Sequence, residues 1–485
     1  MVRVILDQRC DFVCDGAYPG MGARGRKRRH RQTAALGPAA PARRSAARNG
    51  AGGCAFAPPV EPLEGRTLLS LTPAGEPFRV NAPEDVFDFF PTVAMDADGD
   101  SVVSWFHINQ DFSDGWPVAR MFDAQGNPKG PEFQVNTVPQ AQFEPHVDMN
   151  DDGSFEVAFL NNSGALYVRS FDPAGNPHGP EFAVNDGLPG NSIGGGYPYA
   201  DIASLQDGGF VIAFTQNLPG GTNAIFARRY GADDQPAAPA YRVDSAAGQA
   251  GGMDVEVAVN DKDEVMVAWR QRTNPFDTSG VSDLYARVFS DTDVPAGPQF
   301  LIDGGGDHSV PALSGTNRNF VVTWRDSGGV HGAPQSIRAR RFNHRGNALG
   351  APVLVQSNLA APASIGPVGP WVEATPDGRF AVTWAVDGAD FSHPGTAYLR
   401  QFDSAGAPVS GVTQLGTGPD TLGLGGFAAD DNLAHGLLVW NKGSNSSIEG
   451  QFVADPAAAP AAPSSTFAGS SQDDDSTAAT DLLYA

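Results

Sequence analysis

The sequence predicts an all-β protein, a seven-bladed β-propeller of four-stranded antiparallel blades, and three observations predict this fold. An apolar segment with a closing aromatic residue occurs seven times, and the closing aromatics are Trp105, Phe159, Phe214, Trp269, Trp324, Trp384 and Trp440. Successive aromatics are 54, 55, 55, 55, 60 and 56 residues apart. Further elements keep the same phase around each apolar segment, so every repeat has the size of one propeller blade.

Each repeat contains four strands in a fixed order. In the first repeat, residues 92–95 form the first strand, and the Asp-Gly turn at residues 96–99 leads into the apolar second strand. A third strand with the pattern Tyr-Ala-Arg-x-Phe follows at residues 118–122. After another Gly-bearing turn, residues 132–136 form the fourth strand. Such units cannot bury both sheet faces alone, so we expect them to pack side by side around an axis.

The ends of the repeat region predict how the ring closes. Residues 77–81 have the pattern of a fourth strand but precede the first blade, whereas the seventh blade ends after its third strand at Phe452. We therefore expect residues 77–81 to supply the outer strand of the seventh blade and to remove an exposed sheet edge. The predicted organisation is a basic, largely disordered segment over residues 1–70, the propeller over residues 71–455 and a disordered acidic tail over residues 456–485.

Charge is distributed unevenly along the 485 residues. Residues 1–70 contain 12 Lys and Arg residues and 5 Asp and Glu residues, which gives a formal charge of +7. The rest of the chain contains 20 Lys and Arg residues and 50 Asp and Glu residues, which gives a formal charge of −30. A body this acidic repels nucleic acid, which excludes DNA and RNA as expected partners. No run of 18 apolar residues exists, so we expect no transmembrane segment. All three cysteines precede residue 70, so disulfides do not hold the propeller together.

An arginine recurs two residues before the final aromatic of the third strand in six repeats. The six residues are Arg120, Arg169, Arg228, Arg287, Arg340 and Arg400, and Gly450 takes the place of arginine in the seventh repeat. Alternation along a strand puts the arginine and the aromatic on the same sheet face. A position repeated in nearly every blade favours a structural role, such as an inter-blade hydrogen bond or stacking on the ring; a ring of anion-binding groups is the alternative.

The acidic turns suggest calcium as the one metal to consider. Asp96, Asp98 and Asp100 alternate around Gly99, but calcium takes six to eight oxygen ligands and this turn lacks a distal glutamate. An Asp-Gly turn forms without a metal. The expectation is therefore no cofactor, with calcium at these three aspartates as the open alternative.

The long connections carry the aromatics that we expect to meet a ligand. The second-to-third-strand and blade-to-blade loops are long and variable, unlike the short turns at the other end of the blades, and binding usually resides in such loops. The candidate binding-face aromatics are Phe112, Trp116, Tyr197, Tyr199 and Phe391, beside Phe87, Phe89 and Phe90. Unimportant variation of the loops is the competing interpretation.

No catalytic residue is assigned from the sequence. The Gly-x-Ser-x-Gly string at residues 190–194 lies in a loop rather than between a strand and a helix, so it does not predict a nucleophile elbow. The nine histidines form no zinc-binding pattern. Carboxylate pairs for glycoside hydrolysis would be distant in sequence and stay open.

Two segments resemble known bacterial sequences. Residues 60–70, Val-Glu-Pro-Leu-Glu-Gly-Arg-Thr-Leu-Leu-Ser after a basic stretch, resemble the LEPR-XLL-type N-terminal motif of large exported planctomycete proteins, although Leu63-Glu64-Gly65 separate Pro62 from Arg66. The body resembles bacterial repeats of the form Val-Ala-x-Asp-x-Asp-Gly…Ala-Arg-x-Phe-Asp, which generally have no assigned activity. The first resemblance implies an extracellular or cell-surface location.

These observations favour a non-catalytic surface or secreted scaffold that binds protein or polysaccharide through its long loops. A glycan-active enzyme, hydrolase or lyase, with its site in the central channel is the first alternative. A calcium-stabilised structural protein is the second.

Overall fold

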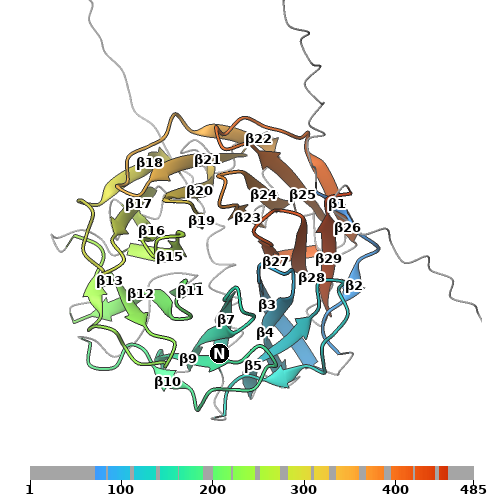
Figure 1. Cartoon of the computed structure of the whole chain (residues 1–485), viewed down its shortest axis with the longest axis horizontal. Coiled ribbons are helices and arrows are strands. Elements are labelled where there is room, and N and C mark those ends of the chain that lie inside the picture. Colours follow the sequence, from blue (N-terminus) through green and yellow to red (C-terminus); the bar gives the residue numbers. More distant parts are fainter. Residues whose placement is uncertain are drawn as a thin grey trace, which may run out of the picture. The chain divides into compact units, whose positions relative to one another are not determined.

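Seven antiparallel sheets stand around a common axis in the computed structural model (Figure 1), which confirms the predicted seven-bladed β-propeller. The residues that the structure describes are 71–82, 86–109, 114–137, 142–161, 163–188, 200–219, 222–245, 252–272, 282–306, 308, 311–326, 335–359, 368–386, 395–418, 421–442 and 447–456. These residues contain no helix long and apolar enough to span a membrane. The predicted basic segment lies outside the described residues, and so does the predicted acidic tail apart from its first residue, Pro456.

The four strands of each blade follow one another from the axis outward. Blade 1 contains β3 (Val86–Met95), β4 (Ser101–Asn109), β5 (Gly115–Phe122) and β6 (Phe133–Gln134), and blade 2 contains β7 (Gln142–Met149), β8 (Phe155–Asn161), β9 (Leu166–Phe171) and β10 (Phe182–Ala183). Blade 3 contains β11 (Ala200–Ser204), β12 (Phe210–Leu218), β13 (Thr222–Tyr230) and β14 (Tyr241–Arg242). Blade 4 contains β15 (Gly252–Val259), β16 (Val265–Arg272), β17 (Ser282–Phe289) and β18 (Phe300–Gly306). Blade 5 contains β19 (Ala312–Thr316), β20 (Asn319–Asp326), β21 (Gln335–Asn343) and β22 (Val353–Leu359). Blade 6 contains β23 (Val368–Ala374), β24 (Phe380–Val386), β25 (Gly395–Phe402) and β26 (Thr413–Gly418).

Blade 7 joins the two ends of the described chain. Its first three strands are β27 (Thr421–Ala429), β28 (His435–Lys442) and β29 (Ser447–Ala454). The outer position is taken by β1 (Thr72–Pro73) and β2 (Phe78–Arg79), which both pair antiparallel with β29. Phe78 lies opposite Gly450, so the predicted closing strand is present, and β1 extends the closure beyond the predicted segment.

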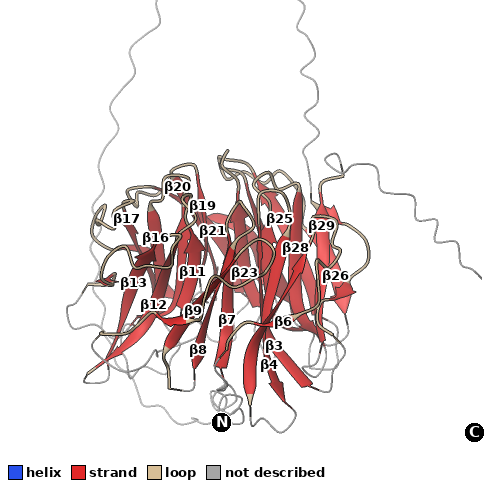
Figure 2. Cartoon of the chain, turned by 60° about the horizontal axis from the view of Figure 1, so that its bottom comes forward, coloured by secondary structure: helices blue, strands red, loops and turns tan. Residues whose placement is uncertain are grey.

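The blades end on two different sides of the ring, as the side view shows (Figure 2). The turns between first and second strands and between third and fourth strands lie on what we call the short-turn side. The connections between second and third strands and between blades lie on the long-loop side. Parts of these loops lie outside the described residues.

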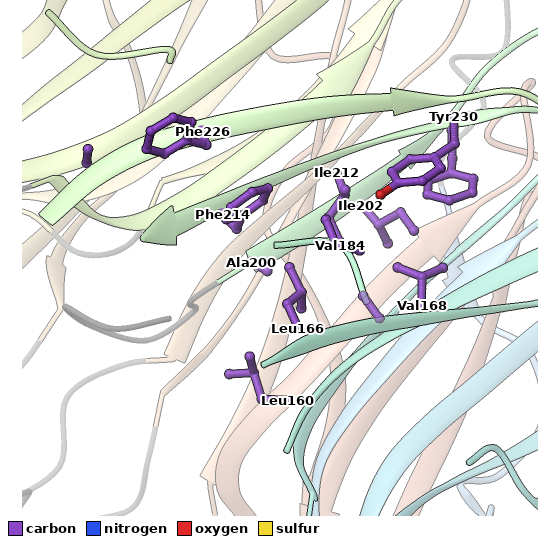
Figure 3. Close-up of a cluster of buried hydrophobic side chains, with 13 residues drawn as sticks. Leu160, Leu166, Val168, Val184, Ala200, Ile202, Ile212, Phe214, Phe226 and Tyr230 are labelled. Atoms are coloured by element: carbon purple, nitrogen blue, oxygen red, sulfur yellow. The ribbon is translucent and has the colours of Figure 1, made fainter. Parts of the chain in front are cut away.

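The hydrophobic core is divided among the blade junctions, because each sheet buries both faces against its neighbours. Seven clusters of buried side chains span the seven junctions. Figure 3 shows the cluster between blades 2 and 3, where Leu160 and Val168 meet Ile202, Phe214 and other buried side chains of blade 3. The second strands are buried on both faces, which explains why the sequence shows them as continuous apolar runs.

The six repeated arginines connect neighbouring blades. Each donates a hydrogen bond from Nη1 to a main-chain carbonyl at the outer strand of the preceding blade; the acceptors, in order, are Val80, Val135, Val184, Val243, Ile302 and Val355. Each guanidinium also lies 5.4–5.7 Å from the centre of the aromatic ring two residues later. The hydrogen bonds cross six of the seven junctions, whereas each ring contact lies within one third strand and holds the arginine in place.

The seventh junction uses the N-terminal segment instead of an arginine. A side chain at Gly450 would collide with the Phe78 ring, which lies 2.8 Å from the position of a Cβ atom. At the junction of blades 6 and 7, Leu71 is fully buried and its main-chain N–H donates to Oε1 of Gln401 at 2.8 Å. Residues 71–82, which we call the closing segment, therefore make the contacts at this junction that an arginine makes at the other six.

Arg287→Ala is expected to lower the free energy of unfolding by about 2 kcal/mol, because it removes two charge-assisted hydrogen bonds and a cation–π contact. The lost partners are the carbonyls of Val243 and Gly297 and the ring of Phe289. Urea unfolding would measure the change. Arg345→Ala, at an exposed turn, is the control and should change the midpoint little; equal effects of the two substitutions would contradict the structural role.

Candidate functional site

Blade 1 places aromatic and polar side chains together at its long-loop end. Trp116 lies at the start of β5 and is half-buried. Its ring packs against the His107 ring, with 4.7 Å between the centroids. Of the five candidate binding-face aromatics, Trp116 alone lies among the described residues, because Phe112, Tyr197, Tyr199 and Phe391 lie outside them.

His107 lies beside a buried aspartate. Nδ1 of His107 lies 3.0 Å from Oδ1 of Asp88, and both residues are almost fully buried. Nδ2 of Asn81 donates to Oδ2 of Asp88 at 2.5 Å, and Nδ2 of Asn441 donates to its main-chain carbonyl at 2.7 Å. The polar groups beneath Trp116 are therefore fixed by contacts that also connect the closing segment with blade 1.

Three phenylalanines lie on β3 near the same end. The ring centroids of Phe87 and Phe89 are 6.3 Å apart, and those of Phe89 and Phe90 are 6.0 Å apart. All three are half-buried. Phe90 has a φ of 53° at a break in the β3–β4 register, a conformation that costs energy for a residue other than glycine. The same backbone conformation recurs at Asp254 of β15 and Gly369 of β23, also at breaks in register, so only the grouped rings distinguish this end of β3 from those two first strands.

Three ionisable side chains occupy equivalent positions on the first strands of blades 2, 3 and 4. His146, Asp201 and Glu256 each pair with an alanine of the second strand, and these alanines are Ala158, Ala213 and Ala268. Nδ1 of His146 lies 3.7 Å from Oδ1 of Asp201. Glu256 and Asp201 share a side-chain hydrogen bond. The three side chains form a row across two blade junctions, which we call the inner-strand row.

Burial changes the protonation of the inner-strand row. It raises the pKa of Asp201 to about 7, and together with the charge of Asp201 it raises the pKa of Glu256 well above the ordinary value. Burial lowers the pKa of His146 to about 4, so this imidazole is neutral at pH 7. The carboxyl of Asp201 is therefore partly protonated near neutral pH.

Two more inner-strand carboxyls lie one step toward the short-turn side. Burial raises the pKa of Asp148, and it raises the pKa of Glu373 well above the ordinary value, with the charge of Asp148 acting in the same direction on Glu373. Oδ2 of Asp148 accepts the main-chain N–H of Ser204 at 2.6 Å, and Oδ2 of Asp201 accepts that of Val257 at 2.8 Å. Part of this carboxyl set therefore bridges neighbouring first strands.

The three aspartates considered for calcium lie on the short-turn side of blade 1. Oδ1 of Asp96 accepts the main-chain N–H groups of Asp98 and Asp100 at 3.0 and 2.9 Å. Oδ2 of Asp100 forms an ion pair with Lys129 at 2.7 Å. Among the described residues, no group of three or more His, Cys, Asp or Glu side chains is placed to hold a metal ion. Calcium binding by this turn stays a prediction.

The inner-strand row was missed by sequence reasoning. His146, Asp201 and Glu256 are different residue types in three separate repeats, so no short motif contains them. Aligning the repeats on their closing aromatics would have put all three at one position of a strand that is otherwise mostly apolar. That position is the signal the sequence offered.

A comparison with solved structures finds distant proteins of partly similar structure. BP39L lectin from Burkholderia pseudomallei matches with a TM-score of 0.51 and 15% identity, over 78% of this chain and 97% of that chain. A protein of unknown function from Dyadobacter fermentans matches with a TM-score of 0.47 and 11% identity, over 79% and 99%. An alpha-L-arabinanase from Penicillium chrysogenum matches with a TM-score of 0.43 and 13% identity, over 64% and 92%. At these identities the likeness is one of fold. No protein-family model and no curated protein sequence matches the chain.

Proposed function

We propose that this protein is a non-catalytic carbohydrate-binding propeller that meets its ligand on the long-loop side of blade 1. The observation that carries the proposal is the half-buried Trp116 ring, which packs against His107 beside the buried Asp88 on one face of blade 1. Phe87 and Phe89 lie on the opposite face of the same sheet. Small-molecule sites combine apolar and aromatic walls with a few polar groups held in place. A sugar ring has one apolar face and several hydroxyls, so it matches both parts of this arrangement.

The proposed setting is outside the cell. The N-terminal sequence at residues 60–70 resembles a motif of exported planctomycete proteins, and the acidic body is unsuited to nucleic acid. A matching fold in a lectin is consistent with this function but does not carry it.

Trp116→Ala is expected to weaken glycan binding on a glycan array by roughly tenfold, the loss of one aromatic contact of about 1.4 kcal/mol. Phe133→Ala is the control, since Phe133 is also a half-buried aromatic but belongs to the outer strand β6. The control should lose stability without losing glycan binding. Failure of the unaltered protein to bind any glycan, or equal binding by Trp116→Ala, would contradict the proposal.

A glycan hydrolase is the second candidate, and the inner-strand row favours it. Hydrolysis of a glycosidic bond needs one carboxyl that donates a proton and another that is ionised at the working pH. Burial raises the pKa of Asp201 to about 7 and that of Glu256 well above its ordinary value, and the two carboxyls share a hydrogen bond. Asp201→Asn would abolish hydrolysis by such an enzyme but leave binding at Trp116 unchanged.

A further inference from the structure

The connection from blade 4 to blade 5 contains a buried histidine. His308 lies two residues after β18 and forms an isolated β-bridge with Asp326 of β20, on the long-loop side. The six other isolated bridges of the described residues each join a third strand to the turn that follows it within one blade. Only 2% of His308 is exposed. This residue therefore occupies an interior position between two blades.

Glycine at position 306 leaves room for the His308 ring. A Cβ atom added at Gly306 would lie 2.7 Å from Cε1 and 2.8 Å from Nε2 of His308, which is closer than such atoms approach one another. The main-chain carbonyl of His308 accepts a hydrogen bond from Nη1 of Arg270 in β16 at 3.1 Å. The ring is therefore closely surrounded, and its main chain is held by blade 4.

Both ring nitrogens of His308 face oxygen atoms that accept hydrogen bonds. Nδ1 lies 2.6 Å from the main-chain carbonyl oxygen of Ser282 in β17, and Nε2 lies 3.4 Å from Oδ2 of Asp303 in β18. A neutral imidazole has one N–H group and can donate to only one of these two acceptors, whereas an imidazolium has two and can donate to both. The positions of the acceptors therefore match the protonated ring.

Asp303 also connects the histidine to blade 5. Its Oδ2 accepts a hydrogen bond from Nε1 of Trp324 in β20 at 3.0 Å. Burial raises the pKa of Asp303, but the contacts with His308 and Trp324 outweigh it and hold this pKa below the usual value. An ionised Asp303 thus lies between the imidazole of the connection and the indole of the next blade.

The charges around His308 favour the protonated ring as well. The charged side chains on the strands that surround it, among the described residues, are Asp254, Arg270, Asp283, Asp303, Asp326 and Arg338. Arg270 is paired with Asp254, and Arg338 is paired with Asp326, so neither guanidinium is left to repel an imidazolium. Burial lowers the pKa of His308, but the hydrogen bonds to Asp303 and Ser282 and the negative charges of Asp303 and Asp326 raise it above 6.5.

The buried ring still exchanges protons through its partner. The side chain of Asp303 is 33% exposed, whereas that of His308 is 1% exposed. Water therefore reaches the carboxylate that contacts Nε2, and the sheet does not need to open for the proton to leave. Loss of this proton leaves the ring with one N–H group for two acceptors.

We propose that His308 is a pH-dependent switch between blades 4 and 5, in which the imidazolium joins β17 and β18 to the Asp303–Trp324 pair and the neutral ring does not. The stability that this contact contributes is fully present below pH 6.5, the ordinary pKa, and is lost as the pH rises through the higher pKa of the folded protein. The inference goes beyond the proposed function and does not depend on it, since Trp116 belongs to blade 1.

A histidine titration of the full chain by NMR, with ¹³C-labelled imidazole rings, tests the protonation state. The chain has nine histidines, and the signal that disappears in His308→Gln belongs to His308. We expect its titration midpoint to lie above 6.5 and to fall in Asp303→Asn, which removes the negative charge but keeps an acceptor for Trp324. A midpoint at or below 6.5, or one that Asp303→Asn leaves unchanged, would overturn the inference.

Hydrogen exchange of the peptide that covers β18 and His308 tests the contact itself. Rates are corrected for the intrinsic effect of pH and compared at about pH 5.5 and about pH 8.5. The unaltered protein should lose more protection between these two pH values than His308→Gln does, and Asp303→Asn should behave like His308→Gln. Equal losses in the unaltered protein and in both variants would contradict the switch.

His344→Gln is the matched control for these measurements. Nδ1 of His344 also lies beside a carboxylate, 3.0 Å from Oε1 of Glu264, but on the short-turn side of the blades. This variant should keep the full pH-dependent loss of protection at β18. A loss as small as that of His308→Gln would show that removing any histidine has the same effect, and it would overturn the assignment to His308.

Discussion

A chain that lacks residues 71–82 should melt about 10 °C below the full-length protein, because the deletion removes about 5 kcal/mol of buried contacts at roughly 2 °C per kcal/mol. Leu71 and Val80 are both fully buried, in clusters that join blade 7 to its two neighbours. The deletion also takes away the carbonyl of Val80 that accepts from Arg120, and it leaves the edge of β29 without a partner.

Scanning fluorimetry at a fixed heating rate would measure the shift. Leu71→Ala should reproduce part of it, at about 2–5 kcal/mol for a buried leucine, whereas Glu76→Ala, at an exposed position, should not. An unchanged melting curve for the deletion would mean that residues 71–82 do not close the ring.

Asp201→Asn should stabilise the protein at pH 8 by about 2 kcal/mol and leave its stability at pH 4 almost unchanged. The folded-state pKa of Asp201, about 7, lies above the ordinary value of 3.8. The folded protein therefore keeps a proton that the unfolded chain loses, and stability falls as the pH rises from about 4 to 7. Asparagine cannot ionise, and its carbonyl can still accept the N–H of Val257.

Melting temperatures of both proteins at several pH values would test this expectation. His146 acts in the opposite direction, because its lowered pKa makes the stability of the protein rise with pH between about pH 4 and 6.5. The inner-strand carboxyls with raised pKa values are more numerous, so their effect on stability is expected to be the larger one. Asp291→Asn, at an exposed turn, controls for the removal of one surface charge. A stability of the unaltered protein that rises steadily between about pH 5 and 8 would contradict the account.

The sequence predicted the features that every repeat contains. The apolar second strands, the Asp-Gly turns and the third-strand arginines each recur at a fixed spacing, so their partners follow from one blade pattern. The closing strand at residues 77–81 followed from counting strands at both ends. These features are local in the chain or repeated along it.

The candidate sites depend on contacts between blades, and a linear sequence does not show them. His146, Asp201 and Glu256 meet only because neighbouring first strands lie side by side around the axis. In the acidic turn at Asp96, the carboxylate accepts two main-chain N–H groups of the same turn, and calcium binding there stays a prediction.

Mass spectrometry of a bound glycan distinguishes a glycan-binding propeller from a glycan-cleaving enzyme. A glycan that the array identifies would be incubated with the full-length protein and then recovered. We predict that the recovered glycan has an unchanged mass and that Trp116→Ala weakens its binding. Recovery of a cleaved glycan, with cleavage lost in Asp201→Asn, would contradict a non-catalytic role and assign catalysis to the inner-strand row.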